Sequence, residues 1–426
     1  MKIIVVGSGL GGLLSAAYLA KNGHEVEVFE ALPIIGGRFT NIDYKGFKLS
    51  TGALHMVPHG NSGPLAQMLK ELDADVNIVP SNPSTVIRMP ANKNDTDYKN
   101  GYMDMSFHDF KIPFSFINRL KIAVLAFTTR YFPPKKGTFE DWIKNHINER
   151  WATRIANSFC GWSISLKSSD VSAKEVFAII SNLYLHSGPG VPIGGCKGVT
   201  DALLEITHKN GGRVYTSKEV SEIIINNNHA KGVIANGDRY YSDIVISDIG
   251  HIETKQLCKN AAKTNEYIQY INQLQDVRPS AGIKISLACD EPLIGHGGVV
   301  LTPFARRIDG INEVTNVDPK LAPEGKHLVM THQCLHWNRI DDIEKEIELG
   351  IQDIKDIFPD KKFDVLMVQS YHDGWPVNRS ASSQDIPNKT PISGLYIVGD
   401  GAKGEGGIEV EGITLGVSNT LDMILS

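Results

Sequence analysis

The sequence predicts an α/β protein with more than one domain, and two observations lead to this prediction. Residues 2–29 follow the pattern of a strand, a helix and a second strand, a βαβ start typical of a parallel sheet. Short alternating stretches within residues 213–246 and 281–370 predict further strands, some of which could form a sheet in a second domain. The chain has 426 residues, which suffices for two or three domains with sizeable cores.

Composition narrows the class of protein. The net charge is −5, so the chain lacks the basic excess that binding to nucleic acid requires. The five cysteines are scattered and form no CxxC pair, which argues against a disulfide framework or a zinc site and favours the cytoplasm. The sequence contains no run of about 18 apolar residues, the length that a helix needs to cross a membrane. We therefore expect a cytoplasmic protein with no metal and no nucleic-acid partner.

A glycine pattern joins the first predicted strand (2–6) to the first helix (10–22): Gly7-Ser8-Gly9-Leu10-Gly11-Gly12. Gly7 permits a tight turn, Gly9 leaves room for a pyrophosphate, and Gly12 lets the helix pack closely on the strand. The free N–H groups at the start of the helix favour phosphate. Glu30 ends the second strand, 21 residues after Gly9, where a carboxylate can accept hydrogen bonds from ribose hydroxyls. The pattern predicts a Rossmann-like dinucleotide site, and the acidic Glu30 disfavours NADP.

The segment after Glu30 distinguishes between dinucleotides. Gly36-Gly37-Arg38, followed by Thr40, resembles a motif of the large flavin family that includes amine oxidases, protoporphyrinogen oxidases and phytoene desaturases. In that family the glycines let the backbone run against the pyrophosphate, and the arginine supplies a cation for it. The resemblance therefore implies FAD as the cofactor.

A second part of the resemblance lies near the C-terminus. The predicted strand 395–398 ends in Gly399-Asp400, where the family's carboxylate meets the ribityl chain and phosphates. In the family a helix then starts at the positions of Gly412 and Ile413 and directs its N-terminus at the flavin. No cysteine follows Cys334, so we expect FAD to be bound non-covalently. The candidate cofactor-binding residues are Gly7, Gly9, Leu10, Gly11, Gly12, Glu30, Gly36, Gly37, Arg38, Gly52, Ala53, Leu54, Val220, Gly399, Asp400, Gly412 and Ile413.

The resemblance also implies how the domains are assembled. We expect a discontinuous FAD-binding domain with a parallel sheet and a β-meander, formed by residues 1–82, 185–252 and 386–426. Residues 83–184 and 253–385 would form an α+β substrate domain with a mixed or antiparallel sheet. Helices are expected at 64–72, 198–209 and 341–357, and from about Ile413 to the end.

Lys284 is the candidate catalytic residue. Its strand resembles the one whose lysine, in amine oxidases, holds a water near flavin N5, although a strand lysine that faces solvent is the alternative. Two residues depart from the family's patterns. Ser50 stands where many relatives have aspartate, and Glu409 stands where amine oxidases often carry an aromatic residue, which weakens an amine-oxidase interpretation. His55 could line the flavin cavity or have a packing role.

The sequence predicts an FAD-dependent oxidoreductase that moves a hydride between flavin N5 and an apolar substrate, which the resemblance suggests is isoprenoid or carotenoid-like. An amine-oxidase-like enzyme, a non-redox flavin isomerase and a prenyl-binding escort protein are the alternatives. Residues 112–134 form a basic amphipathic pattern that predicts either peripheral membrane contact or a core helix. The sequence shows no second nucleotide-binding unit, so it does not indicate which electron acceptor the protein uses.

Overall fold

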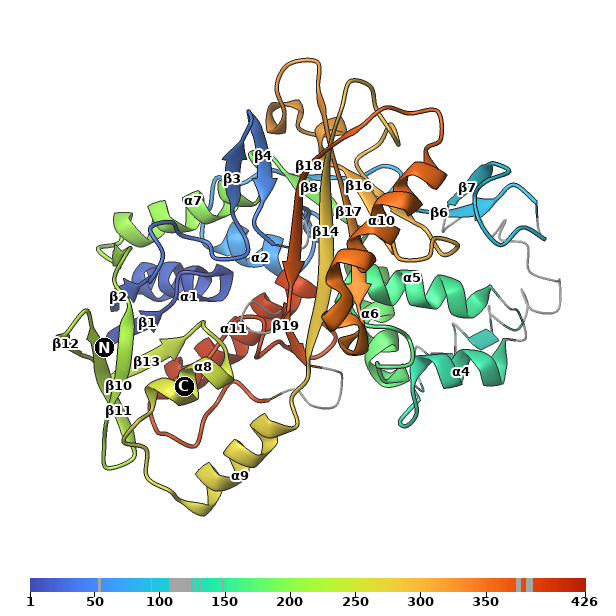
Figure 1. The fold of residues 1–426 in the computed structure, drawn as a ribbon. Helices are drawn as coiled ribbons and strands as arrows, with labels where there is room; N and C mark the ends of the chain where they lie inside the picture. Colours follow the sequence, from blue (N-terminus) through green and yellow to red (C-terminus); the bar gives the residue numbers. More distant parts are fainter. Residues whose placement is uncertain are drawn as a thin grey trace.

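The structure is a computed structural model with a mixed α/β fold, so the predicted class is confirmed (Figure 1). The described residues are 1–52, 55–92, 94–106, 121, 124–125, 128–129, 132, 134–147, 149, 151–372, 377–380 and 386–426. Ala53, Leu54 and most of the predicted amphipathic segment 112–134 lie outside them.

A parallel sheet is built from strands that are distant in sequence. Its order is β20-β13-β1-β2-β9, and every neighbouring pair is parallel. The strands are β1 (Lys2–Val6), β2 (Glu25–Phe29), β9 (Arg213–Tyr215), β13 (Ile244–Ser247) and β20 (Leu395–Ile397). Their carboxyl ends meet along one edge, where ligands bind in open α/β sheets.

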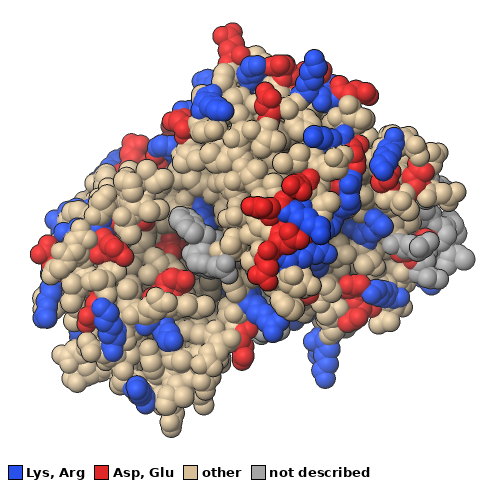
Figure 2. Space-filling view, viewed as in Figure 1, with Lys and Arg blue, Asp and Glu red and all other residues tan. Residues whose placement is uncertain are grey.

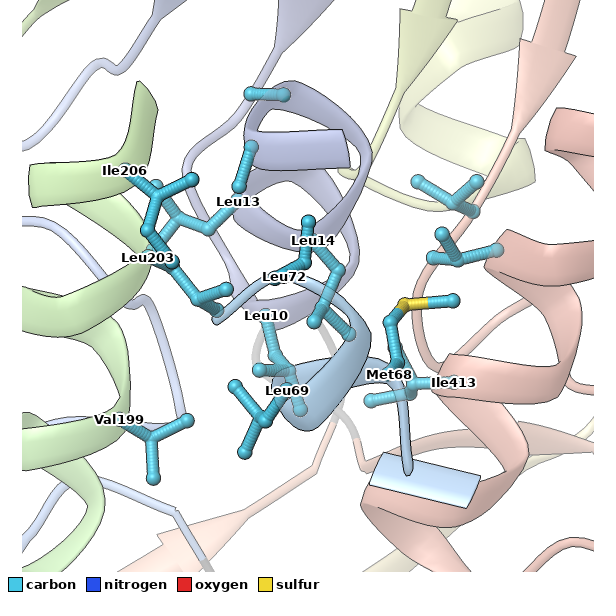
Figure 3. Packing of buried hydrophobic residues seen from close by; sticks show 14 of the residues in the cluster. Leu10, Leu13, Leu14, Met68, Leu69, Leu72, Val199, Leu203, Ile206 and Ile413 are labelled. Atoms are coloured by element: carbon cyan, nitrogen blue, oxygen red, sulfur yellow. The ribbon is translucent and has the colours of Figure 1, made fainter. Parts of the chain in front are cut away.

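Four helices pack together beside this sheet: α1 (Leu10–Lys21), α2 (Pro64–Glu71), α7 (Gly195–Lys209) and α11 (Glu409–Leu425). Figure 3 shows Leu10 and Leu14 of α1 near Leu69 of α2, with Leu203 of α7 on the other side. Each fully buried leucine contributes about 1.5–3 kcal/mol of apolar burial. This cluster fixes where the N-terminus of α1 lies, and so where the glycine turn points.

Two of the predicted helix starts are wrong. We expected α7 to begin near residue 198 and α11 near Ile413, but they begin at Gly195 and Glu409. In α11, Ile408 O accepts hydrogen bonds from the amides of Glu411 and Gly412, so the first turn closes before Ile413. Helix α7 starts at a glycine, and α11 has Gly412 in its first turn; sequence propensity treats glycines as helix breakers, although backbone hydrogen bonds form there.

The predicted meander is formed by β10 (Val220–Asn226), β11 (His229–Ala235) and β12 (Asp238–Tyr241), paired antiparallel. Its turns place Asn227, Asn228, Asn236 and Gly237 at positive φ, as two-residue hairpins require. The last alternating stretch of the predicted meander, β13, is not part of it, because β13 joins the parallel sheet between β1 and β20. Val220 is buried in a cluster with Phe29 at the base of the meander.

The second sheet is mixed and has the order β18-β14-β17-β16-β15-β6-β7, with β19 also paired to β14. Among the described strands, β15 and β6 are parallel and the other pairs are antiparallel. The strands are β6 (Thr85–Pro90), β7 (Tyr102–Ser106), β14 (Pro279–Cys289), β15 (Val299–Leu301), β16 (Gly310–Glu313), β17 (His327–Leu335), β18 (Asp364–Tyr371) and β19 (Val377–Ser380). Helix α10 (Ile343–Ile357) packs Ile354 and Ile357 into the same core as Ile285.

The remaining elements connect or flank the two sheets. They are β3 (Asn41–Tyr44), β4 (Phe47–Ser50), β5 (Ile78–Pro80), α4 (Phe139–His146), α5 (Ala152–Ile164), α6 (Ala173–His186), β8 (Gly190–Pro192), α8 (His251–Leu257), α9 (Asn265–Gln275) and three 3-10 turns, Val314–Asn316, Pro319–Leu321 and Trp337–Asp342. Helices α4, α5 and α6 lie on the side away from β1 and β2 (Figure 1).

Acidic and basic side chains are interspersed over the face shown in Figure 2, including the group over α10. There Arg306 pairs with Asp353 at 3.0 Å, and Arg307 pairs with Glu346. Within the described part of the chain, no helix combines the length and apolar character needed to cross a bilayer.

Candidate functional site

The turn between β1 and α1 requires its glycines. Gly7 has a φ of +92°, which strains any residue with a side chain. A Cβ atom on Gly12 would lie 2.3 Å from Gly7 O, so a side chain there would force α1 away from β1. The predicted roles of these two glycines, a tight turn and close helix packing, match this geometry.

Glu30 is held at the carboxyl end of β2 by the same turn. Its Oε2 accepts hydrogen bonds of 2.8 Å from both the amide and the hydroxyl of Ser8, and its Oε1 accepts one from the amide of Leu32. Two oxygens of a carboxylate offer about four acceptor sites. About one acceptor site therefore remains for a ribose hydroxyl, and the side chain is already oriented.

The Gly36-Gly37-Arg38 segment lies directly against the first glycine turn. Gly36 N donates to Ser8 O at 2.8 Å, and Gly36 forms an isolated bridge with Gly9. A Cβ atom on Gly52 would lie 2.0 Å from Arg38 O, so a third segment packs on the same backbone. The first two motifs and Gly52 thus form one continuous cradle.

The C-terminal motif completes the cradle. Arg38 Nη2 lies 3.1 Å from Asp400 Oδ2, and Lys403 pairs with the other oxygen of Asp400. The Asp400 side chain is 13% exposed and the Lys403 side chain 5%. Sequence reasoning missed Lys403, which could have been suggested by its place one helical turn after Asp400. Two cations and one carboxylate therefore stand beside the glycine turns.

Sequence reasoning also missed Asp248, which follows β13 at the carboxyl edge of the parallel sheet. A Cβ atom built on Gly9 would lie 2.4 Å from Asp248 Oδ2. Burial raises the pKa of this carboxyl to about 7. The signal available in the sequence was its position, since an acidic residue just after a buried parallel strand lies at the ligand edge.

Lys284 on β14 does not face solvent, so that alternative is wrong. The residue is fully buried, and its Nζ donates to Ser50 Oγ at 2.8 Å, to Gly52 O at 2.6 Å and to Ser50 O. Burial lowers the pKa of this amine to about 7. Its three donors are directed at protein acceptors, so Lys284 acts on the Ser50–Gly52 segment.

The next strand of the sheet holds the same segment. Tyr371 Oη on β18 donates to Thr51 O at 2.9 Å, and Gln369 Nε2 donates to it at 3.3 Å. Lys284 is opposite Gln369 in the register of β14 and β18. The second sheet therefore fixes the segment that leads into Ala53 and Leu54.

Two buried histidines lie near Lys284. Burial and the positive charge of Lys284 lower the pKa values of His55 and His332 to about 3, so both imidazoles are neutral at physiological pH. His332 Nε2 is 2.9 Å from Ser165 Oγ. A Cβ atom on Gly195 would lie 2.6 Å from His55 Nε2, which shows how closely α7 packs on that ring.

Helix α11 begins beside the cradle, and its start is tied to α2. Glu411 is fully buried and accepts hydrogen bonds from the amides of His59 (3.2 Å) and Leu65 (2.8 Å). Glu409 has a φ of 44°, a left-handed conformation that costs a side-chain-bearing residue about 1–3 kcal/mol. Gly412 and Ile413 therefore lie inside the first turns of the helix.

An apolar cavity opens between the helices α5 and α6 and the strand β15. Its interior volume is small, about 60 Å³. Most of its lining side chains are apolar, and none is acidic or basic: Met56, Pro58, Thr85, Phe159, Trp162, Ser163, Leu183, Pro189, Val299, Leu301 and Ile408. Of the lining residues, Met56 lies four residues after Gly52, and Ile408 directly precedes α11.

These features define a class of protein. Glycine turns, an oriented carboxylate and paired cations from both ends of the chain form a cradle for a dinucleotide with two phosphates. A flavin dinucleotide fits the residues present, because glycines keep the turn close-packed and free of side chains, and the Arg38 cation stands beside it.

Comparison with known proteins agrees with this class. Residues 10–414 match the model of the flavin containing amine oxidoreductase family, so the chain belongs to that family, and the resemblance seen in the sequence is confirmed. An uncharacterised protein of Methanocaldococcus jannaschii is 44% identical over 426 residues, all of both chains. A crystal structure of an oxidoreductase from Methanosarcina mazei has 54% identity and a TM-score of 0.97, covering 99% of this chain and 100% of the other. The prolycopene isomerase of Daucus carota is 24% identical, covering 96% of this chain and 77% of its own.

Proposed function

We propose that the protein binds FAD non-covalently and transfers a hydride between flavin N5 and an apolar substrate. Family membership implies a flavin, and the cradle supports the dinucleotide form. When bound, FAD supplies a ring system that accepts or donates a hydride. Glu30 would orient the adenosine ribose, whereas Arg38 and the glycine turns would hold the pyrophosphate.

The apolar cavity is the observation that carries the substrate class. An amine substrate is cationic, and its binding calls for a carboxylate or an aromatic cage. The lining offers the hydroxyls of Thr85 and Ser163 and the rings of Phe159 and Trp162, but no carboxylate to pair with an ammonium group. An isoprenoid or carotenoid would place a short apolar segment there, since the volume is about 60 Å³, and would exclude water from the reacting carbon.

Lys284 contributes to the proposed reaction through position. Its three hydrogen bonds hold residues 50–52, and we infer that the flavin rests on the segment that follows. Lys284 is thus a positioning residue in this proposal. The imidazoles of His55 and His332 are neutral and add no charge beside Lys284. The Lys284 amine is therefore the main titrating group among these three buried side chains.

A flavin-dependent isomerase is the second candidate. The similarity to prolycopene isomerase extends over 96% of this chain, whereas the similarity to a phytoene desaturase of Cereibacter sphaeroides extends over 59%. The same cavity suits both reactions, because each acts on a long polyene. They differ in whether the substrate loses hydrogen.

The test begins with the purified protein reconstituted with FAD. We expect a flavin absorption spectrum, and we expect heat or acid to release intact FAD that mass spectrometry identifies. The holoprotein is then incubated without oxygen with polyprenyl, carotenoid and amine compounds. Bleaching of the flavin with a product two hydrogens lighter supports the oxidoreductase. A product of unchanged mass formed with reduced flavin supports the isomerase. A protein that binds no FAD, or that oxidises only amines, would contradict the proposal.

A further inference from the structure

The carboxyl group of Asp248 occupies the space between the two glycine motifs. A Cβ atom on Gly11 would lie 2.7 Å from its Oδ1, one on Gly9 2.4 Å from its Oδ2, and one on Gly399 2.2 Å from its Oδ1. Glycines from both ends of the chain therefore surround this carboxyl group. Its backbone is fixed as well, because Asp248 N donates to Val6 O at 2.8 Å.

The surroundings of the carboxyl group disfavour a negative charge. Its Oδ2 is shielded from solvent and has no hydrogen-bond partner among the described residues, although the residue as a whole is partly exposed. Two further carboxylates face it, Glu30 from the end of β2 and Asp400 from the end of β20. The positive charge of Arg38 and a hydrogen bond from the Gly12 amide favour the ionised form and lower the pKa. Burial is the largest of these influences, and the pKa of the group rises from 3.8 to about 7.

We propose that Asp248 must be protonated for FAD to bind, and that this residue makes the retention of FAD dependent on pH. The inference rests on the proposed function. The pyrophosphate would bring two negative charges to the outer side of the glycine turn whose inner side contacts Asp248. An ionised Asp248 would repel them across a thin layer of backbone, because glycine leaves no side chain between.

The sign of the effect follows from linkage. Nearby phosphate charge raises the pKa of Asp248 further in the complex, so binding at a pH above about 7 takes up a proton. The dissociation constant for FAD should then change little below about pH 6 and rise by up to tenfold per pH unit above about pH 7. Other groups facing the carboxyl are Glu30, Asp400 and Arg38, and the first turn of α1 carries no acidic residue.

Asp248→Asn distinguishes a proton-coupled role from a merely structural one. Asparagine keeps an oxygen that can accept the hydrogen bond from Gly12, and it cannot ionise. Apoprotein is titrated with FAD by flavin fluorescence between roughly pH 6 and 8.5. We expect D248N to bind with a nearly constant affinity and, at the upper end, more tightly than the wild type. Asp201→Asn, an exposed α7 carboxylate paired with Lys197, should keep the wild-type pH profile.

A second measurement needs no variant. Calorimetry of FAD binding to the wild-type apoprotein at about pH 8, in two buffers of different ionisation enthalpy, reports the protons taken up. We expect uptake approaching one proton. No uptake, a flat wild-type profile, or a D248N profile as steep as that of the wild type would overturn this inference while leaving FAD binding intact. Failure to bind FAD at any pH would overturn the proposed function as well.

Discussion

Lys284 and Ser50 join the two halves of the molecule, since Lys284 Nζ on β14 of the second sheet donates to Ser50 Oγ at 2.8 Å, just before the segment proposed to contact the flavin. A buried ammonium that faces hydroxyl and carbonyl oxygens, with no anion among its hydrogen-bond partners, is poorly compensated, and burial lowers its pKa to about 7.

The pH dependence of stability should report this lysine. Between about pH 7 and 10 the unfolded chain keeps the Lys284 proton and the folded chain does not, so stability rises with pH by up to about 1.4 kcal/mol per unit. Lys284→Met should lose that rise. Urea unfolding across this range measures it, and Lys255→Met, on an exposed position of α8, should keep the wild-type slope. Equal slopes for the wild type and K284M would contradict a depressed pKa.

Lys284→Met should also disturb the cofactor site. It leaves Ser50 O and Gly52 O without their buried donor, whereas Ser50→Ala removes one acceptor of three. We expect the affinity for FAD to fall by about tenfold in K284M and by much less in S50A, because an unpaired buried polar group costs about 1–3 kcal/mol. Flavin fluorescence titration of both variants gives the comparison. A larger loss in S50A would show that the hydroxyl matters more than the lysine.

Arg38 is expected to act on affinity with little effect on folding. Arg38→Gln removes a cation from the pyrophosphate position, and Asp400 keeps Lys403 as its partner. A hydrogen bond to a charged group contributes about 1.5–3 kcal/mol, so FAD should bind roughly ten to a hundred times more weakly. Arg213→Gln, which breaks pairs with Glu25 and with the buried Glu27, is the matched control for loss of a paired cation. Unchanged FAD affinity in R38Q would place the pyrophosphate elsewhere.

Gly12 in the N-terminal glycine motif and Gly401 in the C-terminal motif should respond differently to substitution by alanine. In Gly12→Ala the new methyl would meet Gly7 O at 2.3 Å, so we expect a loss of stability of about 1–3 kcal/mol together with weaker FAD binding. In Gly401→Ala the nearest atom lies at 3.5 Å and φ is ordinary, so stability should stay within about 0.5 kcal/mol. Thermal and urea unfolding of both proteins test the pair. A stable G12A protein would show that α1 can move away from β1.

The cavity can be tested by filling it. Leu183 lines the cavity, and Leu185, two residues further along α6, is 71% exposed. Leu183→Trp should reduce turnover of a long polyene by about tenfold or more, which corresponds to about 1.4 kcal/mol, and leave FAD affinity unchanged. Leu185→Trp should leave both unchanged. Normal turnover in L183W would show that the substrate does not use the cavity. Loss of FAD from L183W would show that the substitution acts on the cofactor site instead.

The glycine turn and Glu30 could be placed from the sequence because their interactions are local, whereas the Gly36-Gly37-Arg38 segment was placed by its resemblance to the flavin family. Strand β1, the turn and α1 are contiguous, and Glu30 ends the very next strand. Hydrophobic period and turn chemistry operate over such distances. The start of α11 was misplaced for a related reason, since glycine propensity gives no sign of a helix that tertiary contacts stabilise.

The position of Lys284 shows what the local sequence pattern does not determine, namely the direction in which a strand side chain points. Alternation on β14 indicates a strand, yet both faces of that strand are buried, so the period of two does not reveal that the lysine points inward. Its acceptors come from residues 50–52, more than 200 positions away, and nothing near Lys284 in the sequence specifies them.

The sequence by itself determined the α/β class and the glycine turns, because short-range backbone geometry and residue chemistry fix them, and its resemblance to the flavin family indicated the cofactor. Only the tertiary structure decided that Lys284 is buried against Ser50, that Asp248 lies among glycines of both motifs, and that apolar side chains of α5, α6 and β15 line one cavity. Those facts depend on which distant strands become neighbours in the two sheets. Burial, and with it the pKa values near 7, arises only once those neighbours are in place.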